Sequence, residues 1–220
     1  PAQPVIVREV STFSHDQSQI NLNVDGIPIS NVTPGDPTLA VGPNHIITMV
    51  NGTNGSALFR IFDRNGGALS VQAFMDQLPG SSYSGAGDCI AWYDQLANRF
   101  VMSEFGDSSQ TGTSVNTLII AVSQTPDPLG AWYIYEFSDA SFFPDYPKYG
   151  NWPDAWYGMT RDFQGAYVGN SVWAFNKAKM LAGDPVVEVQ RFRFSSPDNK
   201  YNSMCPVSLS GSAPPPAGTP

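Results

Sequence analysis

Apolar residues along the chain fall into short runs that are separated by turn-forming residues. Residues 46–50 are apolar at nearly every position, as expected for a buried inner strand, and residues 116–123 form a predicted strand rich in β-branched residues. Residues 186–194 alternate instead, as expected for a strand with one face in solvent. A helical pattern is confined to residues 176–183, which end at a glycine, and to a single turn near residues 74–78. The pattern therefore predicts an all-β chain with very little helix.

The same order of features occurs three times along the chain. Asp36, Asp88 and Asp145 each precede a short apolar or aromatic segment, a turn and a returning apolar strand, at steps of 52 (88 − 36) and 57 (145 − 88) residues. Strand repeats of about 40–50 residues are typical of propeller blades. The second repeat holds four predicted strands, which is one blade. We expect an all-β, β-propeller-like fold with four-stranded blades of roughly 50 residues.

The repeats divide the chain into three parts. Residues 1–35 are polar and irregular and are expected to form an N-terminal arm, residues 36–194 the blades, and residues 195–220 a C-terminal segment rich in Pro, Gly and Ser. This division leaves three blades and the start of a fourth, whereas closed propellers have roughly four to eight. Three explanations remain open: an irregular fourth blade, a fragment of a longer chain, or a ring that another copy completes.

Composition narrows the functional classes. The chain has 220 residues, a formal charge of −8 and a pI near 4.5, so nucleic acid is not an expected partner. No apolar run reaches the length of about 18 residues that a membrane helix needs, so no transmembrane segment is expected. Acidity, a first residue other than Met, and three Asn-x-Ser/Thr patterns favour a secreted, extracellular protein. Cys89 and Cys205 are a candidate disulfide pair, with two buried thiols as the alternative.

Several sequence segments resemble those of a known protein family. Residues 36–45, 93–100, 121–133, 143–148 and 174–183, with 152–157 between the last two, resemble a family of secreted, mostly bacterial, sialidase-like β-propellers of uncharacterised function. The resemblance implies a propeller fold and an extracellular location, and it brings no established activity. Members of that family continue beyond the point where this chain ends, which favours a fragment.

Residues 125–132 are similar to the Asp box of sialidases, Ser/Thr-x-Asp-x-Gly-x-x-Trp, with the glycine one place late. The resemblance implies that Asp127 and Trp132 brace a turn: the carboxylate accepts from turn amides and the indole packs beneath. The arginines of this chain do not match the arginine triad of a sialidase. Sialidase activity is therefore not expected.

The repeated aspartates are the strongest candidates for chemistry. If Asp36, Asp88 and Asp145 begin the innermost strands, they approach one another around the channel and raise one another's pKa. They could then bind Ca²⁺, serve as an acid/base pair for glycoside cleavage, or simply cap turns. Trp92 and Trp152 are candidate channel-facing residues on which sugars could stack, with core packing as the alternative.

These observations yield one main functional hypothesis and two alternatives. The main hypothesis is a non-enzymatic extracellular module with a surface-binding, adhesive or structural role, stabilised by calcium, whose partner is a glycan or another cell-surface component. The first alternative is a glycoside hydrolase or lyase that uses the channel carboxylates. The second is a filament or sheath subunit that self-associates, or joins the rest of a longer chain, through open sheet edges.

Overall fold

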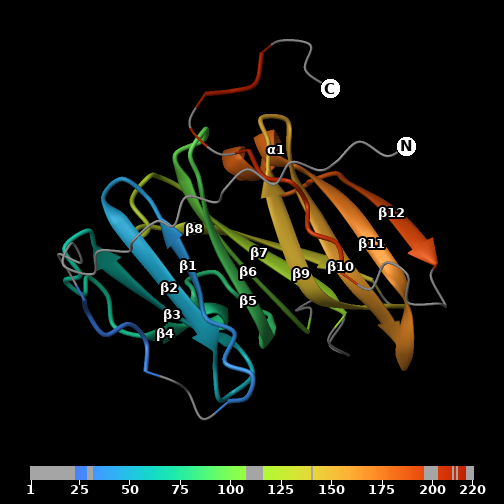
Figure 1. Ribbon diagram of the computed structural model, residues 1–220, viewed down its shortest axis with the longest axis horizontal. Helices are drawn as coiled ribbons and strands as arrows, with labels where there is room; N and C mark the ends of the chain where they lie inside the picture. The colour runs from blue at the N-terminus through green and yellow to red at the C-terminus, as the bar shows by residue number, and fades with distance from the viewer. Residues whose placement is uncertain are drawn as a thin grey trace, which may run out of the picture.

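Three four-stranded antiparallel sheets stand beside one another like propeller blades in the computed structural model (Figure 1). The structure describes residues 23–28, 32–107, 116–139, 141–195, 203–209, 211 and 213–216. Within each sheet, strands that follow one another in sequence are hydrogen-bonded neighbours. The predicted all-β fold of propeller-like, four-stranded blades is confirmed.

Each blade is a simple meander. The first blade consists of β1 (Thr38–Val41), β2 (His45–Asn51), β3 (Ala57–Asp63) and β4 (Ala73–Phe74), followed by the 3₁₀ turn η2 (Met75–Gln77). The second consists of β5 (Ser84–Asp94), β6 (Arg99–Asp107), β7 (Thr117–Ser123) and β8 (Trp132–Ser138). The third consists of β9 (Phe143–Asn151), β10 (Ala155–Gln164), β11 (Ala166–Asn176) and β12 (Val189–Ser195), with helix α1 (Lys177–Ala182) between the last two strands.

The middle blade is covered on both faces, and its sequence shows why. Every residue of β7 is buried. Ile119 and Ala121 belong to the core shared with the first blade, whereas Leu118 and Ile120 belong to the core shared with the third. Because side chains alternate between the two faces of a strand, a strand packed on both faces needs apolar residues at every position.

Large side chains fill the two spaces between blades. The space between the first and second blades is filled by residues that include Ile47, Met49, Phe59, Phe100 and Met102. The space between the second and third is filled by Val101, Leu118, Ile120, Val122, Trp156, Trp173, Phe175 and Met180. These contacts set the position of each blade relative to the next.

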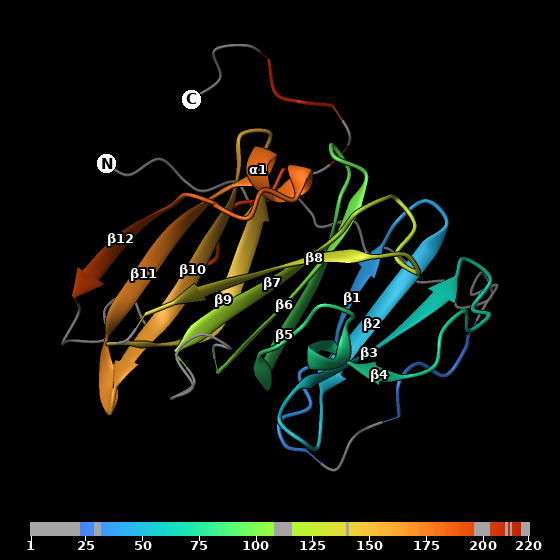
Figure 2. The ribbon, with the colours of Figure 1, turned by 180° about the vertical axis from the view of Figure 1, so that it is seen from behind.

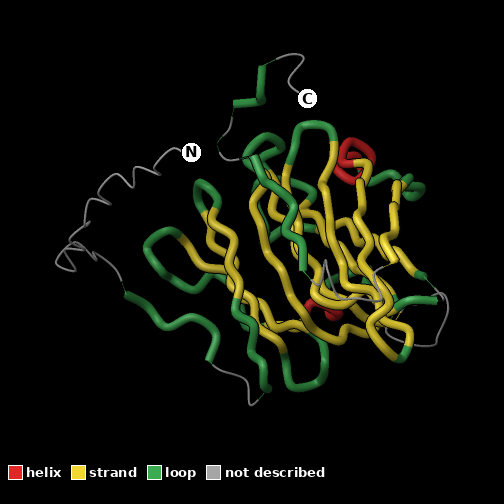
Figure 3. The backbone as a smooth tube through the Cα atoms, turned by 45° about the vertical axis from the view of Figure 1, so that its right-hand side comes forward, coloured by secondary structure: helices red, strands yellow, loops and turns green. Residues whose placement is uncertain are grey.

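The first strand of each blade is the innermost one. Strand β5 lies in contact with both β1 and β9, so the three inner strands are neighbours although they are far apart in sequence. Figure 2, seen from behind, shows the sheets spreading outward from this region, and Figure 3 shows the loops gathered at the two ends of the strands. The start of each inner strand therefore lies close to the starts of the others.

Local signals explain the short helix. The side chain of Asn176 caps the N-terminus of α1 by accepting from the Lys179 N–H, and Gly183 ends the helix in the left-handed conformation at φ 72°. Within the described part of the chain, no helix has the length and apolar character needed to cross a membrane.

Part of the predicted C-terminal segment lies along the inner edge of the third blade. The Leu209 N–H donates to the Asn151 carbonyl (2.9 Å) and Trp152 Nε1 donates to the Val207 carbonyl (2.7 Å). Much of the predicted arm, residues 1–22 and 29–31, lies outside the described residues. The division of the chain into arm, blades and C-terminal segment stays a prediction.

Candidate functional site

A backbone irregularity recurs at the start of each inner strand. Asp36, Asp88 and Tyr146 have φ values of 43°, 51° and 53°, in the left-handed region that residues other than glycine rarely adopt. In the second blade, Asp88 and Cys89 form the bulge in β5. The third blade has a bulge at the corresponding place in β9, whereas in the first blade Asp36 lies just before β1, which pairs regularly.

The third repeat differs from its sequence-based alignment by one residue. In the second blade, Gly87 pairs with Phe105 before the bulge. In the third, Asp145 pairs with Arg161 before the bulge, so Tyr146 occupies the position of Asp36 and Asp88. The prediction that Asp145 holds the same place as the other two aspartates is corrected accordingly. The sequence could not show the shift, because it depends on which residue lies across the strand pair.

The three residues with positive φ line one cavity of about 310 Å³. Its lining combines three charged groups with apolar and hydroxyl-bearing neighbours from all three inner strands: Asp36, Pro37, Thr38, Asp88, Cys89, Ile90, Tyr146 and Lys148. Two of the three predicted aspartates thus line one cavity, and the third, Asp145, lies directly before Tyr146. Lys148 was not predicted, although its place three residues after Asp145 could have indicated it.

Hydrogen bonds fix the carboxylates. The Tyr146 N–H donates to Asp88 Oδ2 (3.1 Å), and the same N–H counteracts the rise that burial causes in the pKa of Asp145. Asn51 Nδ2 donates to Asp36 Oδ2 (3.2 Å). Asp88 and Asp145 therefore lie on either side of one backbone amide, which brings the second and third blades together at a pair of carboxylates.

The electrostatic surroundings of these two carboxylates differ. Burial raises the pKa of Asp88, and the neighbouring charges of Asp145 and Asp36 raise it further. Burial also raises the pKa of Asp145, but the guanidinium of Arg161, 3.5 Å away, opposes that rise. Burial lowers the pKa of Lys148, which the carboxylates of Asp88 and Asp36 counteract. Both carboxyl groups thus have a raised pKa, and Asp145 is the one of the two whose rise a neighbouring guanidinium opposes.

The two predicted channel-facing tryptophans lie elsewhere. Trp92 stacks on Tyr149 (ring centroids 4.8 Å apart) and packs into the core between the second and third blades. Trp152 is half-buried and donates to the C-terminal stretch through Val207. Neither lines the cavity at Asp36, Asp88 and Tyr146. Trp92 is four residues beyond Asp88 in β5, and Trp152 follows the end of β9, so both lie away from the residues that line the cavity.

The cysteines do not form the predicted disulfide. Cys89 is a buried free thiol on β5, and Cys205 is an exposed free thiol. Burial raises the pKa of Cys89 to about 12, which makes it a poor nucleophile. The Cys89 thiol instead donates to the Asp36 carbonyl (3.5 Å).

This arrangement predicts a thiol count. We expect the native protein to react with one equivalent of a thiol reagent such as Ellman's reagent, through Cys205, because only the exposed thiol is accessible. Two equivalents should react after denaturation in the absence of reductant. Cys205→Ser should remove the native signal, and a native protein that shows no thiol even when unfolded would instead contain the disulfide.

The predicted turn brace lies at the β7–β8 turn. Asp127 Oδ1 accepts from the Leu129 N–H (2.9 Å), and the buried indole of Trp132 donates to the Pro128 carbonyl (3.1 Å). Both side chains therefore bond within one turn, and Asp127 Oδ1 also lies 3.7 Å from His45 Nε2 on β2.

The described residues contain no group of three or more His, Cys, Asp or Glu side chains arranged to hold a metal ion. The positive charge inside the cavity comes from Lys148, whose ammonium lies 3.4 Å from the centre of the Tyr146 ring. Calcium at Asp36, Asp88 and Asp145 stays a prediction.

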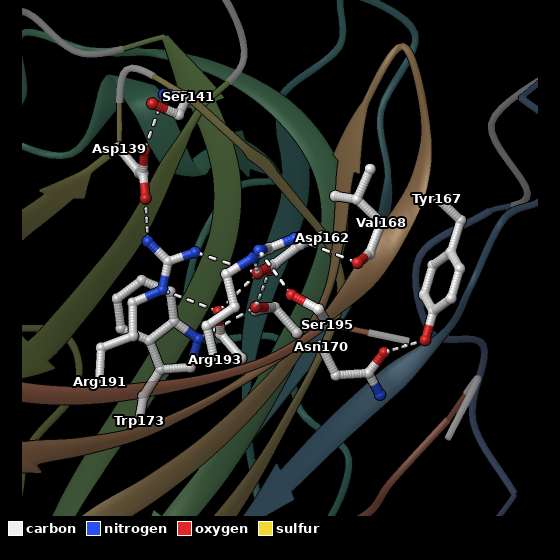
Figure 4. Close-up of polar contacts among 12 residues, drawn as sticks. Asp139, Ser141, Asp162, Tyr167, Val168, Asn170, Trp173, Arg191, Arg193 and Ser195 are labelled. Carbon is white, nitrogen blue, oxygen red and sulfur yellow. Dashed lines mark hydrogen bonds and ion pairs between the residues drawn. The ribbon is translucent and has the colours of Figure 1, made fainter. Parts of the chain in front are cut away.

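A buried charge network on the third blade was not anticipated from the sequence. Asp162 is fully buried and accepts from Arg191 Nη2 and Arg193 Nε, both at 3.1 Å, and from Ser171 Oγ at 2.6 Å. Figure 4 shows the two guanidinium groups converging on this carboxylate from β12. The alternation of β12 indicated that Arg191 and Arg193 share a face, but their partner on β10 could be found only from the sheet register.

Comparison with known proteins gives a likeness of fold. No protein-family profile and no curated protein matches the chain. Solved structures of exo-beta-1,3-galactanase from Phanerochaete chrysosporium do match. A variant with beta-1,3-galactotriose has 11% identity and a TM-score of 0.46, over 78% of this chain and 42% of that one. The enzyme with galactose has 11% identity and a TM-score of 0.43, over 76% of this chain and 42% of that one.

The chain thus spans 42% of the length of the galactanase it resembles. That enzyme is a glycoside hydrolase, which contradicts the expectation of a non-enzymatic adhesive or structural module and agrees with its first alternative. At 11% identity the likeness concerns the fold. Any argument for an activity must come from the residues of the cavity itself.

Proposed function

We propose that this protein contributes a glycosidase-type active site, in which Asp88 and Asp145 cleave a glycosidic bond by general acid and base catalysis. The observation that carries the proposal is the meeting of these two carboxylates at the Tyr146 N–H, beside a cavity, with opposite charged neighbours. A pair of carboxyl groups with separated proton affinities is the requirement for this chemistry.

The roles follow from the surroundings of each carboxylate. Asp88 is the acid, because burial and the charges of Asp145 and Asp36 favour its protonated form. It gives its proton to the glycosidic oxygen as the bond between that oxygen and the anomeric carbon breaks. Asp145 is the base, because Arg161 favours its ionised form. It takes a proton from the water whose oxygen forms the new bond to the anomeric carbon.

The other charged groups of the cavity have supporting roles in this proposal. Asp36, held by Asn51, keeps a negative charge near Asp88 and so helps to retain the proton there. Lys148 limits the total negative charge of the cavity. A neutral sugar is the substrate class that fits, since a further anion would meet three carboxylates.

A polysaccharide substrate also suits a secreted protein, and we propose that the protein acts outside the cell on a glycan. We also propose that the Asp-box-like turn at residues 125–132 has the structural role that the Asp box has in sialidase-like propellers.

The activity test uses variants that separate acid from base. We expect the purified protein to hydrolyse members of a panel of aryl glycosides and neutral oligosaccharides, β-1,3-linked ones included. Asp88→Asn should lower kcat/KM for the oligosaccharide by about 100-fold or more, and far less for a dinitrophenyl glycoside, whose leaving group needs no protonation. Asp145→Asn should lower both, because water activation is lost for every substrate.

Asp25→Asn is the matched control, since Asp25 is exposed and outside the cavity. It should leave both rates unchanged. A folded protein that hydrolyses no member of the panel, or an Asp88→Asn variant with full activity on oligosaccharides, would overturn the proposal.

Calcium binding is a separate proposal for the same carboxylates. It is supported by the raised pKa of Asp88 and Asp145, because a divalent cation would relieve their repulsion. Calcium titration calorimetry on the wild type and on Asp88→Asn tests it. Binding that the variant loses supports the cation, and equal heats of dilution for both proteins rule it out.

A further inference from the structure

A second cavity is lined by one of the two proposed catalytic residues, Asp145. It has a volume of about 500 Å³ and is lined by the rings of Phe143 and Phe163 and by the polar residues Asn116, Ser141, Asp145 and Gln164. Asp145 lines this cavity, and the next residue, Tyr146, lines the first one. Two consecutive residues of β9 thus line the two cavities, and the proposed catalytic base lines the second one.

Aromatic rings form one wall of this second cavity. Phe163 lies between Phe143 and Tyr167, with centroid separations of 6.3 and 5.8 Å, and Phe105 meets Phe143 edge-on at 4.8 Å. The guanidinium of Arg161 lies over Phe163 (5.1 Å) and over Tyr167 (5.5 Å). Packing on several sides holds these rings in place, so the wall is preformed.

A charge network holds one polar residue of the lining, Ser141. The Ser141 N–H donates to Asp139 Oδ1 (2.7 Å), and Asp139 is paired with Arg191, which is anchored on the buried carboxylate of Asp162 (3.1 Å). Figure 4 shows this connection running from Ser141 through Asp139 to the two arginines. The network that stabilises the third blade thereby also positions a residue that lines the cavity.

We propose that this second cavity binds a neutral sugar residue of the substrate, next to the residue whose glycosidic bond is cleaved. The C–H face of a pyranose would lie against Phe163, because apolar sugar faces pack on aromatic rings. Its hydroxyls would meet Gln164, Asn116 and Ser141. A preformed apolar wall with a few converging polar groups is typical of small-ligand sites. This inference rests on the proposed glycosidase function and adds that the substrate is an oligosaccharide.

The test compares substrates of different length. Phe163→Ala should lower kcat/KM for a trisaccharide by about 10-fold, the equivalent of one good stacking contact, and leave an aryl monosaccharide within 2-fold of wild type. Gln164→Ala, at an exposed position, should lower the trisaccharide value more modestly and has little reason to disturb folding. Phe192→Ala is the matched control, because Phe192 is an exposed phenylalanine on β12 and does not line the cavity.

Binding measurements separate this inference from the proposed activity. Trisaccharide affinity is measured by calorimetry with the Asp88→Asn background, where hydrolysis is suppressed. Affinity that falls about 10-fold with Phe163→Ala but not with Phe192→Ala supports the sugar site, even if no hydrolysis is found. The sugar site is overturned if neither Phe163→Ala nor Gln164→Ala changes the kcat/KM or the affinity for the trisaccharide. If hydrolysis still depends on Asp88 in that case, the proposed activity stands without the sugar site.

Discussion

Asp94→Asn is expected to lower the free energy of unfolding by about 3–5 kcal/mol, the usual cost of leaving one member of a buried ion pair without its partner. Asp94 is fully buried, and Lys177 Nζ lies 2.5 Å from its Oδ2. An asparagine of nearly the same shape would leave the ammonium of Lys177, itself only 4% exposed, without a compensating charge.

The effect should be large because Asp94 joins two blades. Its Oδ1 accepts from the turn amides of Leu96 (3.0 Å) and Ala97 (2.9 Å) in the second blade. It also accepts from Asn151 Nδ2 (3.2 Å), and its Oδ2 accepts from Trp156 Nε1 (2.8 Å), both in the third blade. Loss of the carboxylate therefore weakens a turn and an interblade contact at once.

Urea unfolding followed by tryptophan fluorescence measures this change. Asp154→Asn is the matched control: Asp154 is exposed, and its carboxylate accepts only from the nearby Tyr157 hydroxyl among the bonds of the described residues. It should change stability by less than about 0.5 kcal/mol. An Asp94→Asn variant as stable as this control would show that the network contributes little.

The stability of the wild-type protein should fall as the pH rises from about 5 to 8, and Glu104→Gln should remove that part of the pH dependence. Glu104 is fully buried, and burial raises its pKa to about 7. It accepts hydrogen bonds from Ser56 Oγ (2.9 Å), the Ala57 N–H (2.8 Å) and Tyr83 OH (2.8 Å), which oppose the rise. The carboxyl group of Glu104 is thus buried between the first two blades.

The sign follows from the two proton affinities. The folded state binds this proton more tightly than the unfolded state, in which Glu titrates near its ordinary value of 4.5. Stability from the protonated form is therefore complete below about pH 4.5 and is lost as the pH rises through about 7. Between pH 5 and pH 8 the loss amounts to about 2–3 kcal/mol.

A glutamine can keep the same contacts without ionising. Its carbonyl can accept from Ala57, and its amide can donate to the hydroxyl oxygens of Ser56 and Tyr83. We expect the stability difference between Glu104→Gln and wild type to shift by about 2–3 kcal/mol in favour of the variant between pH 5 and pH 8. Urea midpoints at several pH values measure it. A difference that stays constant across this range would show that Glu104 has an ordinary pKa.

Much of the fold could be predicted from local patterns. The apolar run at residues 46–50 and the β-branched run of β7 predicted strands, and Asn176 and Gly183 marked the two ends of α1. These signals suffice because strand alternation, turn chemistry and helix caps act within a few residues. The repeat spacing of 52 and 57 residues, with four predicted strands in the second repeat, then indicated four-stranded blades.

The candidate site was determined in part by the sequence and in part by the tertiary structure. The sequence placed Asp36 and Asp88 at the starts of neighbouring inner strands, where the structure finds them lining one cavity. The register of β9 against β10 decided that Tyr146 takes the bulge of the third blade and that Asp145 pairs with Arg161 instead. A one-residue shift reverses which face every side chain of a strand points to, and only the partner strand fixes it.

Contacts between blades were decided by the tertiary structure alone. Lys177 reaches Asp94 across 83 positions of sequence (177 − 94), and Trp92 fills the space against Tyr149 where a channel position was expected. Cys89 and Cys205 are free thiols. The position of Cys205 depends on how the C-terminal stretch lies along β9, which the sequence does not show. The local sequence determined the strands and turns, because the hydrogen bonds and side-chain contacts that form them join residues close in sequence. The pairing of buried charges and aromatic rings depended instead on how whole blades pack against one another.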